Sequence, residues 1–287
     1  MYSMSTDILI TRQNADGGWP YVRGNSRTEA TIYAVLALLA AGEKEASERG
    51  LAWLRKTQRR DGGWAAQVGV DESNWTTSLA ALLPREALGP QRHAAAIAWL
   101  MGTTGRESTF EFRLRQWLLG NDSRIQVVAG WPWIPGAGAW VGPTSIAILA
   151  LEKELRRRPL VGIRERVETG RTFLLQRACH DGGWNHGSVR TLGYEANAYP
   201  ETTGMALAAL SGTRAPEIDL AVTVAREFLK QCHSADAQNW LRFGLMAHGA
   251  LPPAYCKPQE IYCRTIPETS LDLLANDAAA GRRFFWC

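Results

Sequence analysis

Three glutamates occupy equivalent positions in a repeated segment of the sequence, each near the start of a run of small apolar residues. They are Glu29 in TEATIYAVLALL, Glu201 in PETTGMALAALSG and Glu268 in PETSLDLLA. Asp272 follows Glu268 by one helical turn and stands among leucines, where burial would raise the pKa of a carboxyl group. Carboxylic acids placed in this way can donate protons, so these four residues are candidate catalytic acids. The alternative is that each glutamate only stabilises the positive end of its own helix.

Aromatic residues accompany the same segments. Those expected near the same helix ends are Tyr33, Trp75, Trp140, Tyr199, Trp240 and Phe243. Their ring faces could bind an apolar substrate and stabilise a positive charge on it, and filling the core is the alternative for each. His186 lies in the polar segment 185–200, and its imidazole could carry a proton at neutral pH. A structural role is the alternative for this lone histidine.

A repeated unit must position these residues. Asp-Gly-Gly-Trp occurs at 16–19, 61–64 and 181–184, a degenerate copy is expected to end at Trp240, and GWPW at 130–133 is a further candidate. The segment before each copy has apolar residues at helical spacing with charges between them, which predicts an amphipathic helix. The segment after it is apolar almost all round, which predicts a buried helix. Gly-Gly breaks the chain between them, and the Trp is expected to pack between neighbouring hairpins.

Alternating outer and inner helices of this kind predict an all-α fold, an (α/α)6 toroid in which six inner helices close into a ring. The inner helices are expected at about 29–41, 75–83, 143–155, 201–211, 238–249 and 268–280. The outer helices are expected at about 4–13, 45–58, 91–101, 165–178 and 218–232, with a short or irregular sixth at 251–263. We expect a single domain over 1–287, with an insertion at about 102–129 whose segment 106–120 could add a helix. Closure would bring the equivalent glutamates to one mouth.

The stretch GLAWLRKTQRRDGGW at 50–64 resembles the QW repeat of squalene–hopene cyclases and related triterpene cyclases. The residues that match the family pattern are Gly50, Trp53, Leu54, Gln58, Gly62 and Trp64. In GRTFLLQRACHDGGW at 170–184, Ala178 replaces the glutamine. The β subunits of protein prenyltransferases share the α/α toroid, so the resemblance implies this fold more strongly than it implies a reaction.

Two departures separate the chain from these families. The D-x-D-D motif, which supplies the acid of class II terpene cyclases, is absent, and 70–78 (VDESNWTTS) offers only Asp71 and Glu72. The D-x-C spacing of prenyltransferase zinc ligands is absent too. The pairs Cys179-His180 and Cys232-His233 belong to different hairpins, so no metal site and no cofactor are expected.

Composition and charge exclude several other classes. The net charge of +4 is small and scattered, so nucleic acid is not an expected partner. Five cysteines, an odd number, do not suggest a secreted disulfide framework, and a cytoplasmic location is expected. The N-terminus does not resemble a signal peptide, and no apolar stretch reaches transmembrane length. The tail RRFFWC at 282–287 could touch a membrane surface or pack back on the body, and the oligomeric state stays open.

The favoured interpretation is a terpene cyclase-like enzyme that binds an apolar, isoprenoid-like small molecule in a central cavity. It would act by acid-initiated cyclisation or isomerisation. A prenyltransferase-related activity on such a substrate is part of the same interpretation. One alternative is a carbohydrate-active lyase or hydrolase on the same toroid, which would need a wide polar groove. Another is a non-catalytic binding or scaffold protein. A terpenoid enzyme would need a closed apolar pocket with aromatic walls.

Overall fold

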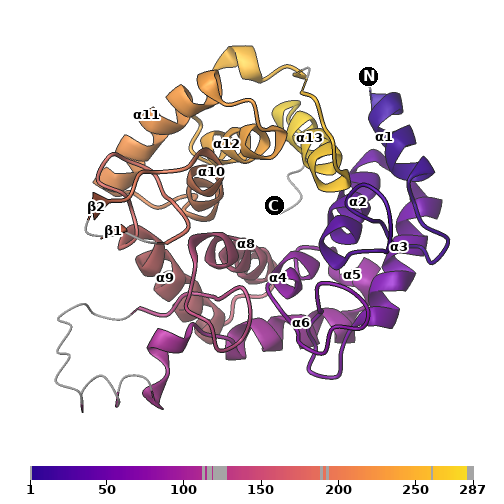
Figure 1. Ribbon diagram of the computed structural model, residues 1–287, viewed down its shortest axis with the longest axis horizontal. Coiled ribbons are helices and arrows are strands. Elements are labelled where there is room, and N and C mark those ends of the chain that lie inside the picture. Colours follow the sequence, from indigo (N-terminus) through magenta and orange to yellow (C-terminus); the bar gives the residue numbers. More distant parts are fainter. Residues whose placement is uncertain are drawn as a thin grey trace.

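Two layers of helices form the ring seen in the computed structural model (Figure 1), which describes residues 2–111, 114, 118, 128–187, 190–191, 194–259 and 261–282. The inner helices are α2 (Thr28–Ala41), α4 (Thr76–Ala80), α8 (Val141–Arg157), α10 (Pro200–Ala209), α12 (Ala235–Ala247) and α13 (Ile266–Ala279). The outer helices are α1 (Tyr2–Thr11), α3 (Lys44–Thr57), α6 (Pro90–Gly102), α9 (Val161–Leu175) and α11 (Pro216–Gln231).

Short elements join these two layers. They are α5 (Arg85–Leu88), the 3-10 turns η1 (Arg106–Ser108) and η2 (Pro253–Tyr255), and the strands β1 (Arg190–Thr191) and β2 (Tyr194–Glu195). The strands form one small antiparallel pair, in which Arg190 faces Glu195 and Thr191 faces Tyr194. The turn η2 stands where the sixth outer helix was expected to be short, because three prolines interrupt that segment.

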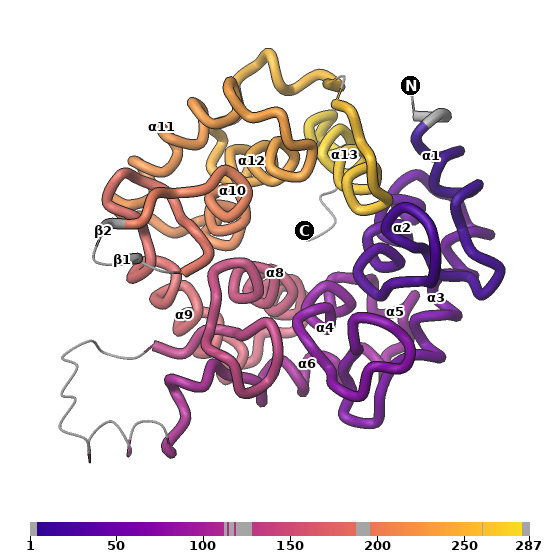
Figure 2. The backbone as a smooth tube through the Cα atoms, viewed as in Figure 1, coloured from indigo at the N-terminus to yellow at the C-terminus, as the bar shows by residue number. Residues whose placement is uncertain are grey.

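The inner helices follow one another around the ring in sequence order, and the ring closes where α13 packs against α2 (Figure 2). The prediction of an all-α toroid is therefore confirmed. Several boundaries differ from expectation: α9 begins at Val161 rather than 165, and α12 begins at Ala235 rather than 238. Helix ends are the least certain part of a sequence-based assignment, because the capping interactions that set them are weak compared with the packing of the helix body.

The Asp-Gly-Gly-Trp turns join the outer layer to the inner one. In the first copy, Asp16 Oδ1 accepts hydrogen bonds from Gly18 N (3.0 Å) and Ser26 Oγ (2.7 Å), and Gly17 has a φ of 93° that disfavours side chains. The buried Trp19 donates its indole N–H to Leu9 O of α1 (2.7 Å), and Thr31 Oγ1 of α2 accepts its backbone N–H (2.9 Å). Each Trp thereby connects an outer helix to the following inner helix through hydrogen bonds.

The other copies repeat this geometry with one exception. Trp64 bonds Leu54 O and Thr77 Oγ1 at 2.9 Å each, and Trp184 makes the equivalent pair of bonds. Trp131, in the GWPW candidate, donates to Leu100 O and Thr144 Oγ1 at 2.9 Å each, which confirms that assignment. The expectation for Trp240 is wrong, because this residue lies inside α12 and not on a turn.

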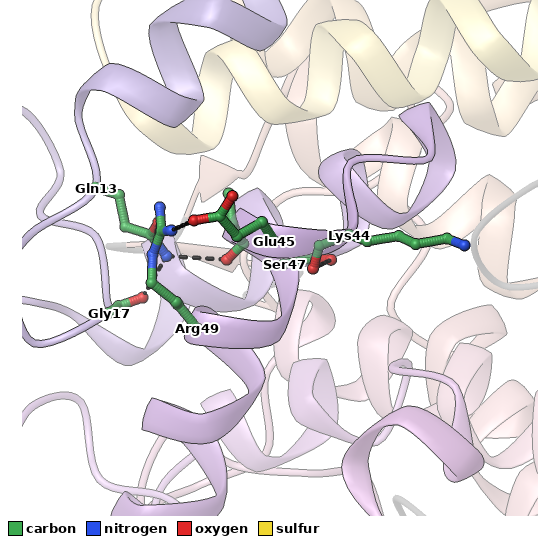
Figure 3. A network of polar contacts seen from close by, with 7 residues as sticks. Gln13, Gly17, Lys44, Glu45, Ser47 and Arg49 are labelled. Atoms are coloured by element: carbon green, nitrogen blue, oxygen red, sulfur yellow. Dashed lines mark hydrogen bonds and ion pairs between the residues drawn. The ribbon is translucent and has the colours of Figure 1, made fainter.

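The glutamine of the repeat connects successive units. Gln13 Nε2 donates to Gly17 O of its own turn (2.8 Å) and to Ala46 O at the start of the next outer helix (2.9 Å). Its Oε1 accepts a bond from Arg49 Nε (2.9 Å), and Arg49 also pairs with Glu45 (Figure 3). Gln58 bonds Gly62 O and Arg92 O in the same manner, at 2.9 Å each.

The insertion is tied down at its base. Arg166 of α9 donates to Thr103 O (3.1 Å), Ala129 O (2.9 Å) and Gly130 O (3.1 Å), so it joins the two ends of the expected segment. Much of the helix expected at 106–120 lies outside the described residues, as does 283–287 of the tail. Among the described residues, no helix combines the length and apolarity needed to cross a membrane.

Candidate functional site

Four carboxyl groups meet at the first turns of four inner helices. Glu29 of α2 and Glu201 of α10 are joined by Asp236 of α12 and Glu268 of α13, and all four side chains are partly exposed. They are close enough that the charges of the three glutamates all raise the pKa of Asp236. The structure thus brings the three equivalent glutamates together and adds a fourth acid that sequence reasoning missed.

Asp236 is the most perturbed acid of this cluster. Burial, then the charges of Glu201, Glu29 and Glu268, raise its pKa well above the ordinary value. Its side chain also shares a hydrogen bond with Glu201, an arrangement that favours one proton between two carboxyl groups. A signal for it existed in the sequence: Asp236 is the second residue of its helix, as Glu29 and Glu201 are of theirs. The expected start of α12 at 238 placed it outside the helix.

Glu29 has a partner from the loop before its helix. The Tyr21 hydroxyl donates a hydrogen bond to Glu29 Oε2. Burial raises the pKa of Glu29, the Tyr21 hydrogen bond lowers it, and the charge of Glu201 raises it. One turn deeper lies Tyr33, which is only 2% exposed, and burial followed by the charges of Glu29, Asp236 and Glu201 raises its pKa. Tyr33 therefore lies beneath the cluster, where its hydroxyl stays protonated.

Glu268 is engaged as a helix cap. Its Oε2 accepts bonds from the backbone N–H groups of Arg264 (2.6 Å) and Thr265 (2.9 Å), and Thr265 Oγ1 accepts from Glu268 N (3.2 Å). This reciprocal pair is a capping box, so the structural alternative accounts for the position of Glu268. Its negative charge still acts on Asp236.

Asp272 is bound to a separate polar network. The residue is 9% exposed, its Oδ1 lies 3.8 Å from Arg242 Nη1, and its Oδ2 accepts a bond from Asn276 Nδ2 (3.0 Å). Burial raises its pKa to about 6, while Arg242 and Asn276 act in the opposite direction. At pH 7 the carboxyl group is therefore mostly ionised, which argues against Asp272 as the proton donor.

Aromatic side chains surround another part of the same mouth. Trp140 and Tyr199 immediately precede α8 and α10, are 41% and 50% exposed, and hold the exposed His186 between them. The His186 ring centroid lies 6.1 Å from that of Trp140 and 5.3 Å from that of Tyr199. Trp75 precedes α4 and packs edge-on against Trp133 with centroids 4.9 Å apart. Trp140 and Tyr199 thus present exposed aromatic surface at the starts of two inner helices.

Trp240 and Phe243 do not belong to this group. Both are completely buried, and their ring centroids lie 5.7 Å apart in an edge-on contact. Neither side chain reaches solvent, and neither lines the described cleft of the first two units, which favours the core-filling alternative. Both follow the first turn of α12 within a fully buried stretch, and their contact with a substrate stays a prediction.

A cleft of about 880 Å³ lies between the loops of the first two units. Its lining includes Asn25, Trp53, Lys56, Arg59 and Gln67, and none of the four clustered carboxyl groups. Within the described part of the chain, no group of three or more His, Cys, Asp or Glu side chains could hold a metal ion. The perturbed acids therefore remain the chemically distinctive groups.

Comparison with known proteins places this geometry in a structural class. Residues 1–78 match the family model described as the squalene-hopene cyclase C-terminal domain. The apo structure of the type II terpene cyclase MstE from Scytonema is 20% identical, with 97% of this chain and 77% of that chain covered and a TM-score of 0.54. A search of curated protein sequences finds no match.

Glycosidases share the same architecture. A GH8 endo-beta-1,4-glucanase from an Achatina fulica gut metagenomic library is 16% identical, with 96% of this chain and 97% of that chain covered and a TM-score of 0.60. The endoglucanase Cel10 of Klebsiella pneumoniae, a family 8 glycosyl hydrolase, is 14% identical, with 97% and 99% covered and a TM-score of 0.59. At these identities the likeness concerns the fold. The chain is an α/α toroid, an architecture that it shares with this terpene cyclase and these glycosidases, and the match to a squalene-hopene cyclase domain is confined to residues 1–78.

Proposed function

We propose that the protein is an enzyme that protonates an isoprenoid-like small molecule at the mouth of the ring, with Asp236 as the acid. The observation that carries this proposal is the position of Asp236 among three glutamates, which raises its pKa well above the ordinary value. A carboxyl group in that environment keeps its proton to a higher pH than an ordinary aspartic acid and can act as a general acid. The match of residues 1–78 to a squalene-hopene cyclase domain supports an isoprenoid-like substrate.

The same electrostatics limit what Asp236 can protonate. A raised pKa means a weaker acid, and a carbon–carbon double bond is a very poor base. The acceptor is therefore an oxygen atom of the substrate, such as that of an epoxide, an allylic alcohol or an ether. Proton transfer to that oxygen allows a carbon–oxygen bond to break and leaves a carbocation on the substrate. The negative charge that remains on Asp236 is shared with Glu201 through the hydrogen bond between the two carboxyl groups.

The aromatic rim suits the next step. Trp140 and Tyr199 present exposed ring faces beside the first turns of α8 and α10, and such faces stabilise a cation without accepting its proton. Cyclisation or isomerisation would follow from attack by another double bond of the substrate. His186, held between the two rings, is positioned to remove the final proton.

Glycoside hydrolysis is the second candidate. The observation in its favour is a carboxyl pair, Asp236 and Glu201, beside aromatic rings that are 41% and 50% exposed. Paired carboxyl groups perform acid and base roles in glycosidases, and exposed rings can stack on sugars.

Replacing Asp236 by Asn tests both candidates. We would assay the wild type against polyprenyl epoxides, alcohols and ethers and, separately, against cello-oligosaccharides, with product analysis by mass spectrometry. The Asp236→Asn variant should lose activity by about 100-fold or more, because general acids contribute at least that factor. Asp219→Asn is the matched control, since Asp219 lies in the first turn of outer helix α11 and is exposed.

The outcome of this assay decides between the isoprenoid enzyme and the glycoside hydrolase. Turnover of an isoprenoid that depends on Asp236 supports the proposal. Turnover of glucans alone would replace it with the second candidate. Binding without turnover of any compound, or undiminished turnover by Asp236→Asn, would overturn the assignment of Asp236 as the acid.

A further inference from the structure

The loop at 20–27 crosses the seam where the ring closes. Tyr21 O accepts a hydrogen bond from Ile266 N, the first residue of α13, at 2.8 Å. Val22 O accepts another from Arg12 Nη1, just beyond α1, at 3.1 Å. The backbone of this loop is therefore fixed from both the first and the last unit of the ring, although the Tyr21 and Val22 side chains are 41% and 45% exposed.

The fixed backbone aims the Tyr21 hydroxyl at the carboxyl cluster. Tyr21 donates to Glu29 Oε2, across eight residues of sequence. The charged groups that act on this pair are Arg27 at the end of the loop and Glu201 of α10, and the charge of Glu29 in turn acts on Tyr33 of α2 and Asp236 of α12. Arg27 is the one cation among them, and its effect falls on Tyr21.

We propose that Tyr21 is a positioning residue, which the closed seam holds against Glu29 so that its hydroxyl stabilises the ionised form of Glu29 within the cluster that contains Asp236. Its relevance to a reaction rests on the proposed function. The residue carries no catalytic step itself, because its hydroxyl is committed to Glu29. It acts on Asp236 through the charge of Glu29.

The direction of this effect follows from the contacts. A hydrogen bond to an ionised carboxylate stabilises the ionised form, and the Tyr21 bond lowers the pKa of Glu29 against the effects of burial and of Glu201. Without that bond Glu29 would hold a proton more readily. The loss of its negative charge would then lower the pKa of Asp236, since Glu29 is one of the charges that raise it. The two carboxyl groups should thus shift in opposite directions.

Carboxyl titration by NMR of the whole chain tests the proposal without a substrate. Tyr21→Phe removes the hydroxyl and keeps the backbone bond to Ile266 N. We expect the pKa of Glu29 to rise and that of Asp236 to fall relative to wild type. Tyr262→Phe is the control, because its side chain is 80% exposed and it should leave both values unchanged.

A second variant keeps the test decisive if Tyr21→Phe does not fold. Glu29→Gln removes the charge directly, and the pKa of Asp236 should again fall. Adding Tyr21→Phe to Glu29→Gln should then produce no further shift. Unchanged titration of Glu29, or an additive shift of Asp236 in the double variant, would overturn the proposal. Failure of the proposed function would instead leave these titrations as expected and appear in the turnover assays, as undiminished turnover in Asp236→Asn, turnover of glucans alone or binding without turnover.

Discussion

Replacing Gly204 by Ala should strongly destabilise the ring where α10 crosses α12. A Cβ atom added at Gly204 would lie 2.3 Å from the carbonyl carbon of Trp240 and 2.5 Å from Leu241 N, both on the facing backbone. From the other side, a Cβ added at Gly244 would lie 2.6 Å from Gly204 O. The two helices therefore make backbone contact through facing glycines, and neither clash can be relieved by rotating a side chain.

The size of the effect follows from these distances. Ordinary contacts of a Cβ atom begin at 3.4 Å, so the helices would have to separate by about 1 Å. Forcing an extra carbon into a packed core costs about 1–3 kcal/mol and more where backbone must move. Because Ala has a better helix propensity than Gly, the substitution also stabilises the helix, but by at most about 1 kcal/mol. We expect Gly204→Ala to lower the free energy of unfolding by about 2 kcal/mol or more.

Gly142→Ala provides a matched control on another inner helix. Gly142 is the second residue of α8, and a Cβ added there would find its nearest neighbour, the Trp133 ring, at 3.5 Å. We expect this variant to be neutral or slightly stabilised. Urea unfolding followed by circular dichroism measures both variants against wild type. Equal stability of the two would show that α10 and α12 can move apart freely, and the argument from backbone contact would fail.

Two further predictions concern Trp64 and Asp272. Trp64→Ala should cost about 3–5 kcal/mol in urea unfolding, because Trp64 is fully buried and bonds Leu54 O. The exposed Trp140→Ala should cost far less, and an unchanged unfolding midpoint for Trp64→Ala would contradict the role of the turn. The pKa of Asp272 is raised from 3.8 to about 6 by burial, so the folded state binds this proton more tightly than the unfolded chain. Its contribution to stability should therefore be lost as pH rises from about 4 to about 6. Asp272→Asn should remove that part of the pH dependence of the free energy of unfolding. Equal slopes of the free energy of unfolding against pH in both proteins would refute this prediction.

The carboxyl cluster shows where sequence reasoning succeeds and where it stops. Glu29, Glu201 and Glu268 could be grouped because they stand at equivalent places in repeats, and closure of a ring makes equivalent places neighbours. Asp236 occupies the same place in α12, but the start of that helix is set by weak capping contacts, such as that of Ser234 Oγ with Ala237 N at 3.5 Å. A shift of three residues in the expected start was enough to hide it.

The sequence by itself determined the toroid, the alternation of its layers and the structural role of the tryptophans. These features depend on helical periodicity and on turn residues, which are local properties and are repeated along the chain. Only the tertiary structure decided which acid of the cluster has its pKa raised well above the ordinary value, because the pKa of Asp236 depends on burial and on charges from three other helices. It also decided that Tyr21 meets Glu29, since closure joins its loop to Ile266 at the far end of the chain. Local sequence patterns do not predict such long-range contacts, because these contacts form only when the ring closes.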